Sequence, residues 1–168
     1  LTDVSVSNNG GAGVSATGGT VTIRRSVAQE NDGGGLYLDD VRFDVQNTVV
    51  GGRGPEGNSE TGVTIRNPTA GSVFANNTVA SNVTSSGNAA GVDCNEGFAI
   101  LNSILWNNMG GAGDVRMCDA SSSSVDIDPN FDTDGYHLTA SSTCCIDMAD
   151  DGAAPDDDID GDERPCVA

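Results

Sequence analysis

Lysine is absent from this 168-residue chain, and all seven of its basic residues are arginine. The sequence therefore cannot form a Schiff base or a phosphate-binding loop that needs lysine. A single histidine, His137, excludes metal sites built from several histidines. Leucine, methionine, glutamine, glutamate and arginine together supply only 23 residues. This shortage of helix formers argues against a helical bundle and against a doubly wound α/β domain.

Positive charge is also scarce, because 25 acidic residues stand against the seven arginines and give a formal net charge of −18. Such a charge argues against nucleic acid or an anionic membrane as a partner. No apolar run approaches the roughly 18 residues of a membrane span. Five cysteines occur without a CxxC or Cys/His ligand pattern. They predict disulfides and a secreted protein, either extracellular or at the cell surface.

Two kinds of segment alternate from the N-terminus to about residue 118. The first kind is an apolar-alternating stretch that occurs at residues 21–27, 43–49, 73–79 and 98–104. The second kind follows a glycine and occurs at residues 13–16, 35–38, 62–65 and 91–94, with a looser copy at 115–117. Successive glycine-led copies are 22, 27, 29 and 23 residues apart. This spacing is typical of a solenoid in which each repeat forms one coil.

The alternation predicts short strands with one face inward. Stacking places Ala16, Leu38, Ile65, Cys94 and Met117 in one interior column, and Val27, Val49, Val79 and Ile104 in another. At one corner the alignment stacks Asn47, Asn77 and Asn102, with Arg25 as the departure in the earlier coil. We interpret these asparagines as a structural amide ladder, with a polar binding strip as the alternative.

The strand pattern, together with residues 102–108, 125–131, 134–142, 145–147 and 158–165, resembles the secreted bacterial right-handed parallel β-helix repeat proteins. These are the surface-anchored members of the pectate-lyase-like superfamily. The resemblance implies an all-β, right-handed parallel β-helix of about five to six coils. Residues 1–122 would form the coils, and residues 123–168 the final coil, an Asp-rich cap and an acidic tail. The fold hosts enzymes and structural proteins alike, so it does not assign an activity.

The first coil begins at Leu1 without a helix that would cap it. An uncapped coil exposes an open strand edge and an apolar cross-section. We therefore expect either upstream coils or self-association at the N-terminal edge.

The acidic tail contains a candidate calcium loop. Asp156, Asp158 and Asp160 precede Gly161 with the spacing of an oxygen-ligand loop, and Asp162 could add a ligand. Val167 stands where an EF-hand has its bidentate glutamate, so the loop is not an EF-hand. The alternative is a solvated acidic tail.

Cys94 and Cys118 are 24 residues apart, which is about one coil. We expect them to form a disulfide across a one-residue bulge, with two buried thiols as the alternative. We expect Cys166 to tie the tail to Cys145 or Cys144, which leaves one thiol over.

These features favour a non-catalytic extracellular module that is structural or adhesive and assembles end to end into filaments. The alternative is a polysaccharide-active enzyme of the lyase type, or a carbohydrate-binding fragment of one, that contacts surface polysaccharide. The mixed cluster that would serve a lyase is Tyr37, Asp39, Asp40, Arg42 and Asp44, with Arg66 one coil above Asp39. A salt-bridged solvent face explains the same cluster.

Overall fold

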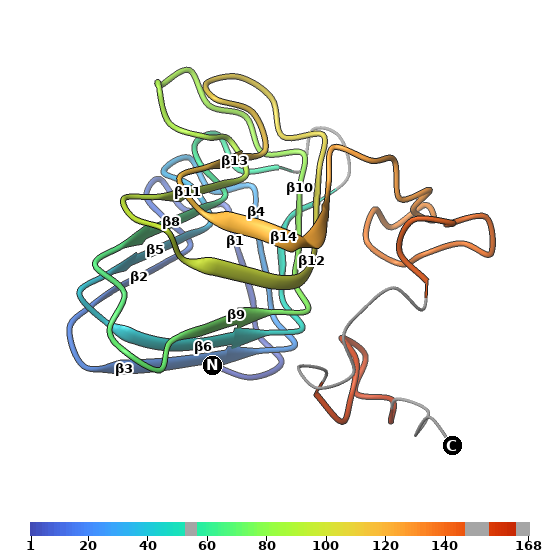
Figure 1. Cartoon of the computed structure of the whole chain (residues 1–168), viewed down its shortest axis with the longest axis horizontal. Helices are drawn as coiled ribbons and strands as arrows, with labels where there is room; N and C mark the ends of the chain where they lie inside the picture. The colour runs from blue at the N-terminus through green and yellow to red at the C-terminus, as the bar shows by residue number, and fades with distance from the viewer. Residues whose placement is uncertain (53–56, 147–154, 164–168) are drawn as a thin grey trace.

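A computed structural model of the chain describes residues 1–52, 57–146 and 155–163. In this part of the chain there are fourteen strands and no helix. The strands are parallel and stack as a β-solenoid of about five turns, which confirms the predicted fold class (Figure 1). The handedness of the coils and the division at residue 122 stay predictions.

Two sheets run along the solenoid. The smaller sheet contains β2 (Val14–Thr17), β5 (Leu36–Asp39), β8 (Val63–Arg66), β11 (Val92–Cys94) and β13 (Val115–Arg116). The larger sheet contains β1 (Ser5–Ser7), β3 (Thr20–Arg24), β4 (Val27–Gln29), β6 (Arg42–Gln46), β7 (Val49–Gly51), β9 (Val73–Ala75), β10 (Thr78–Ala80), β12 (Ala99–Trp106) and β14 (Asp119–Val125). Each full coil therefore contributes one strand to the smaller sheet and one bent pair, or one long strand, to the larger.

The core forms because alternate residues of every strand point inward. Ala16, Leu38, Ile65 and Cys94 pair in one continuous register, as predicted. Met117 does not continue this column, since it has φ 57° and is largely exposed. The left-handed residue turns Cys118 inward instead, and Cys118 packs against the core.

Of the second predicted interior column, Val79 lies in the core cluster, whereas Val27, Val49 and Ile104 lie in the neighbouring row. Val49 pairs with Thr78, not with Val79, and Thr78 pairs with Ile104. The side chains that fill the interior here are those of Ala28, Val50, Val79 and Leu105. The sequence alignment set Val73 level with Phe43, but Val73 pairs with Asp44, so the positions expected from there to β10 are displaced by one residue.

The predicted asparagine column also has a different register. Arg25, Asn47, Asn76 and Asn102 share one corner, and all have φ between 44° and 57°. Asparagine tolerates this left-handed conformation better than most residues, which explains its repeated use at the corner.

Asn77 lies one residue further along, between Thr48 and Ser103. Its Oδ1 accepts a hydrogen bond from the Thr48 main-chain amide at 2.9 Å, and its own main-chain amide donates to Ser103 Oγ at 3.2 Å. Asn77 therefore belongs to an interior polar row and not to the corner of Asn47 and Asn102.

The segment after β14 runs back along the side of the solenoid toward the N-terminal coils, as the orange and red trace in Figure 1 shows. The Asn47 side chain donates to the Asp157 carbonyl oxygen at 2.7 Å, and Arg25 forms an ion pair with Asp157. None of the described residues forms a helix that is long and apolar enough to cross a membrane.

Candidate functional site

A ladder of asparagines runs through the solenoid, and all of its members except the exposed Asn9 are buried. Its members are Asn9, Asn31, Asn58, Asn82 and Asn108. Each side-chain amide donates to Oδ1 of the next member at 2.7 to 3.0 Å, and each main-chain amide donates to the same oxygen at 3.0 to 3.2 Å. The whole row therefore points its donors toward the C-terminal coils.

Each interior carboxamide uses its full bonding capacity. The second N–H of Asn31, Asn58, Asn82 and Asn108 donates to a backbone carbonyl oxygen at 2.9 to 3.2 Å. Buried amides that leave donors unpaired would cost about 1 to 3 kcal/mol each. Because every group has a partner, the ladder fixes the register of neighbouring coils instead of weakening the core.

The glycine before each strand of the smaller sheet makes room for this ladder. A Cβ atom on Gly13 would lie 2.7 Å from Asn31 Nδ2. A Cβ atom on Gly62 would lie 2.6 Å from Asn82 Nδ2. The repeated glycine of the sequence is therefore a packing requirement, since real Cβ atoms do not approach so closely.

Asp114 replaces that glycine in the last coil and ends the ladder. It directly precedes β13, and its Oδ1 accepts from the Asn108 side chain at 2.6 Å and from the Asn108 main chain at 3.0 Å. The carboxylate stands where the amide of a further asparagine would lie. Burial raises the pKa of Asp114; the bonds from Asn108 oppose this shift, and the charge of Asp126 adds to it.

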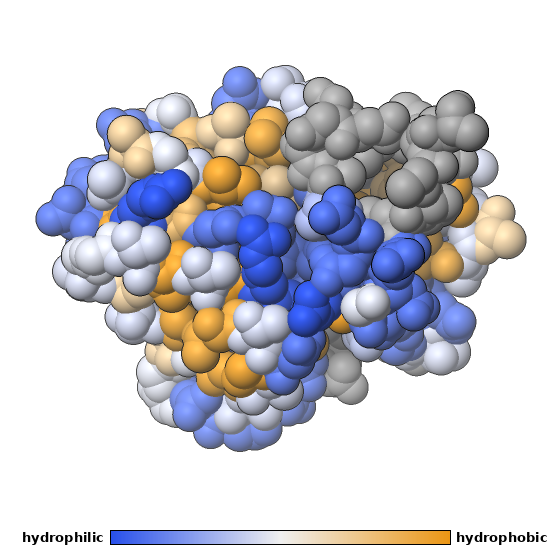
Figure 2. Space-filling view, turned by 90° about the horizontal axis from the view of Figure 1, so that it is seen from below, coloured by the Kyte–Doolittle hydropathy of each residue, from blue (hydrophilic) through white to orange (hydrophobic). Residues whose placement is uncertain are grey.

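Apolar side chains of the first coil are less buried than their partners in the second coil. Leu1 occupies the position of Ile23 one coil earlier, and it is 52 % exposed where Ile23 is 1 % exposed. Val14 and Val21 are half-buried, whereas their partners Leu36 and Phe43 are buried. Figure 2, which views this end, shows a band of hydrophobic side chains flanked by hydrophilic ones.

The first coil also has strand amides that do not face the second coil. The amides of Val14 in β2 and of Gly18 directly after it point toward the second coil, where they donate to the carbonyl oxygens of Gly35 and Asp39. The amide of Ser15 therefore points away from the solenoid, as alternation in a parallel pair requires. Within the described residues, Asn9 Oδ1 accepts no hydrogen bond, although every later ladder oxygen accepts two.

Several residues of the mixed cluster predicted for a lyase bind partners outside the cluster. Arg66 binds the Asp93 carboxylate and not Asp39, and Arg24 binds Asp44 at 2.5 Å. Arg42 donates to the carbonyl oxygen of Gly71 at 3.4 Å. Asp44 and Arg66 thus take part in ion pairs with residues outside the cluster, and the lyase interpretation of the cluster stays a prediction.

Asp93 is a buried carboxylate held by two arginines. Its side chain is fully buried, and it forms ion pairs with Arg66 of β8 and Arg116 of β13. Burial favours the neutral acid, but the bonds from Arg116, the Ala89 amide and Arg66 outweigh it and hold the pKa of Asp93 below its ordinary value. Through these two ion pairs the Asp93 carboxylate links three consecutive coils.

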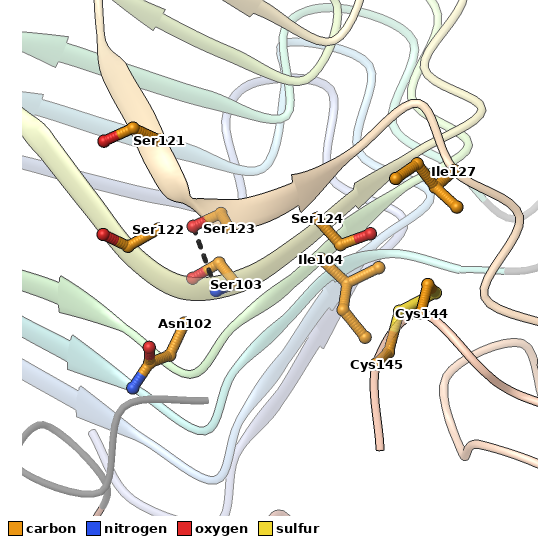
Figure 3. A pocket seen from close by; sticks show the side chains of 10 residues that line it. All are labelled: Asn102, Ser103, Ile104, Ser121, Ser122, Ser123, Ser124, Ile127, Cys144 and Cys145. Atoms are coloured by element: carbon orange, nitrogen blue, oxygen red, sulfur yellow. Dashed lines mark hydrogen bonds between the residues drawn. A yellow bond between two sulfur atoms is a disulfide. The ribbon is translucent and has the colours of Figure 1, made fainter. Parts of the chain in front are cut away.

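The disulfides differ in part from expectation. Cys94 and Cys118 are bonded, with their Cα atoms 5.3 Å apart. Cys145 is bonded to its neighbour Cys144 and not to Cys166, which lies outside the described residues. The Cys144–Cys145 pair lines a hollow of about 350 Å³ beside β12 and β14 (Figure 3), where Ile104 and Ser124 face it.

The predicted calcium ligands do not converge in the described part of the chain, where no group of three acidic, histidine or cysteine side chains is placed to hold a metal ion. Asp158 Oδ1 accepts the amides of Asp160 and Asp162 at 2.9 and 3.0 Å. The Asp160 carboxylate lies 2.6 Å from His137 Nε2, and Asp156 also lies in this loop. Calcium binding by the loop stays a prediction.

His137 is clamped between two carboxylates. Asp134 contacts Nδ1 and Asp160 contacts Nε2. The bond from Asp134 raises the pKa of His137; partial burial opposes this, and Asp160 raises it further. The histidine therefore ties two parts of the C-terminal segment together.

Comparison with known proteins identified no relative of this chain. No family model, no curated protein and no solved structure matches this chain.

Proposed function

We propose that this protein is a non-catalytic structural module of the cell exterior in which a further coil, from upstream residues or from another copy, stacks on the first coil. The observation that carries the proposal is a difference in burial between Leu1 and Ile23. The two residues occupy equivalent positions in successive coils, yet Leu1 is 52 % exposed and Ile23 is 1 % exposed. A coil placed on this end would cover Leu1, Val14 and Val21. Covering half-exposed aliphatic side chains contributes roughly 1 kcal/mol for each.

The secreted location rests on the disulfides. The Cys94–Cys118 disulfide joins the last residue of β11 to the residue that directly precedes β14. Such bonds persist in oxidising compartments and are rare in the cytosol. The acidic surface, at a net charge of −18, suits a protein that must stay soluble while it exposes an apolar end.

A tandem duplication tests the proposal. Coils one and two are related by a constant offset of 22 residues, as in the pairs Val14 with Leu36 and Thr20 with Arg42. Residues 1–22 duplicated ahead of Leu1 would therefore form one more coil in the same register. The duplicated copy of Asn9 would donate to Asn9 Oδ1, as Asn9 donates to Asn31.

We expect the extended chain to melt at a higher temperature than the original chain and to protect the added residues from proteolysis. The matched control carries alanine in place of the duplicated Asn9 and should gain less. An added segment that is cleaved freely and leaves the melting temperature unchanged contradicts the proposal.

A second candidate function, carbohydrate binding, is favoured by one hollow of about 420 Å³ between β12 and the C-terminal segment. It brings Trp106 together with Asp128, Asn130 and Asp132. An indole ring beside carboxylate and amide groups is suited to a sugar ring. Trp106 is the only tryptophan, so its fluorescence during titration with neutral oligosaccharides, compared with that of an Asp132→Ala variant, decides this alternative.

A further inference from the structure

The two disulfides of the described residues differ in how easily they can be reached. Cys94 is buried in the hydrophobic core, and its partner Cys118 is partly buried and packs against the same core. Cys144 and Cys145 are both half-buried, and their disulfide lines the hollow of about 350 Å³ beside β12 and β14 (Figure 3). Thiol–disulfide exchange needs access to a sulfur atom as well as a thiolate. A small thiol can therefore reach the Cys144–Cys145 disulfide more easily than the Cys94–Cys118 disulfide.

The surroundings of the Cys144–Cys145 disulfide are uncharged. Among the described residues that line its hollow, none is charged, and the disulfide faces isoleucine, serine and asparagine side chains such as Ile104 and Ile127. Two other hollows of the chain include Asp158 and Asp132, respectively. Because the chain has a net charge of −18, it repels an anionic thiol, and this hollow offers no cation in compensation. The hollow therefore favours a thiol without charge.

We propose that the Cys144–Cys145 disulfide is a thiol-exchange site, and that the hollow beside β12 and β14 admits small uncharged thiols to it. We take Cys145 as the attacked cysteine, because it lines a second hollow as well. The small thiol gives its proton to water, its thiolate sulfur bonds to Cys145 Sγ, and the Sγ–Sγ bond breaks. The electron pair leaves on Cys144 Sγ, which takes up a proton from water. The small thiol is thereby oxidised to a mixed disulfide with Cys145, and Cys144 is reduced to a thiol.

The structure provides an acceptor for the new thiol. Cys144 Sγ lies 3.7 Å from the carbonyl oxygen of Asp128. A disulfide sulfur has no proton to donate, whereas a Cys144 thiol can donate a weak hydrogen bond to that oxygen. The coils stay linked during the exchange, since the Cys94–Cys118 disulfide joins two successive coils and takes no part. The site would also operate whether or not a further coil stacks on the first.

Timed reduction of the full chain tests the proposal. Free thiols are first blocked with N-ethylmaleimide, and the chain is then exposed to 2-mercaptoethanol, quenched with iodoacetamide and mapped by mass spectrometry. We expect the Cys144–Cys145 disulfide to open at least about tenfold faster than the Cys94–Cys118 disulfide. Equal rates for the two disulfides, or faster opening of Cys94–Cys118, overturn the proposal.

The variant Ile127→Trp tests the route through the hollow. Ile127 lines the hollow and is exposed, so a larger side chain narrows the hollow without entering the core. We expect exchange at Cys144–Cys145 to slow at least about threefold, with the rate at Cys94–Cys118 unchanged. Val83→Trp is the matched control, because Val83 is exposed and is not part of this lining, and it should leave both rates unchanged. An Ile127→Trp chain that exchanges as fast as the original overturns the role of the hollow.

A matched pair of thiols tests the preference for an uncharged ligand. In 2-mercaptoethanesulfonate a sulfonate replaces the hydroxyl group of 2-mercaptoethanol, and each rate is divided by the rate of the same thiol with bis(2-hydroxyethyl) disulfide. We expect 2-mercaptoethanol to react at least about threefold faster with Cys144–Cys145 at low salt. The ratio should fall toward one in 1 M salt, where the Debye length is about 3 Å. A sulfonate thiol that reacts equally fast at low salt overturns the assignment of the ligand class.

Discussion

Asn108 and Asp114 are six residues apart, yet Asn108 gives Asp114 the same two hydrogen bonds that each earlier asparagine gives to the asparagine of the next coil. The loop between them folds back so that Asp114 takes the vacant ladder position. A single residue thus ends a row that runs through five coils. Because a carboxylate accepts but does not donate, the row has one open end and one closed end.

Asn82 is the ladder position where truncation should cost most. Asn82→Ala leaves the main-chain and side-chain donors of Asn58 without an acceptor inside the core. We expect a loss of about 3 kcal/mol or more in the free energy of unfolding, measured with urea. Asn95→Ala is the control, since Asn95 bonds Asn67 on the exposed surface and should cost less than about 1 kcal/mol. Equal losses for both variants would contradict a structural ladder.

The buried Asp93 should be more important for stability than any surface ion pair. Asp93→Asn leaves Arg66 and Arg116 without their counter-charge, and we expect a loss of about 3 to 5 kcal/mol. Asp44→Asn breaks the partly exposed pair with Arg24 and should cost about 1 kcal/mol or less.

The pH dependence of the Asp93 contribution follows from its lowered pKa. A carboxylate with a lowered pKa in the folded state adds stability above its ordinary pKa, and this stability is lost as the pH falls through the folded-state pKa. The difference between the original chain and Asp93→Asn should therefore be constant near neutral pH and shrink in acid below about pH 4. A constant difference down to strong acid would contradict the assignment.

The Cys94–Cys118 disulfide closes a segment with a sequence separation of 24. Replacing both cysteines by alanine should lower the free energy of unfolding by about 2 to 4 kcal/mol. Peptide mapping of the non-reduced protein checks the pairing directly. Two free thiols at these positions would show that they are only packed together.

Asp114→Asn should change stability with the opposite pH dependence from Asp93→Asn. A carboxylate whose pKa is raised by folding loses its favourable contribution as the pH rises through the raised pKa. The variant should therefore melt higher than the original chain at neutral pH and converge with it below about pH 4. Thermal melts at several pH values measure this, and identical melts throughout would mean that burial of Asp114 has no energetic consequence.

The repeated strands could be predicted because each coil repeats the same physical requirement: alternate residues fill a continuous core. Leu38 and Ile65 stack as their spacing indicates. Errors arose at Asn76 and Asn77 because Val73 stands level with Asp44 and not with Phe43, and periodicity alone does not show which residue takes the left-handed conformation. Met117 was misplaced for the same reason.

The ladder itself could have been found but was not. Asn9, Asn31 and Asn58 each stand four residues before the glycine that opens the next strand of the smaller sheet. Later coils lengthen this loop, so Asn82 and Asn108 break the spacing. The terminating role of Asp114 depends on a folded-back loop, and no sequence period contains it.

The most direct test of the central claim is hydrogen exchange of the Ser15 amide, which points outward at the open end. In the chain with residues 1–22 duplicated, this amide should pair with the added coil. We expect the exchange of the Ser15 amide to slow at least about tenfold relative to the original chain. The slowing should be smaller when the duplicated Asn9 is alanine. Exchange of Ser15 that is as fast in the extended chain as in the original would contradict the claim that the N-terminal end accepts another coil.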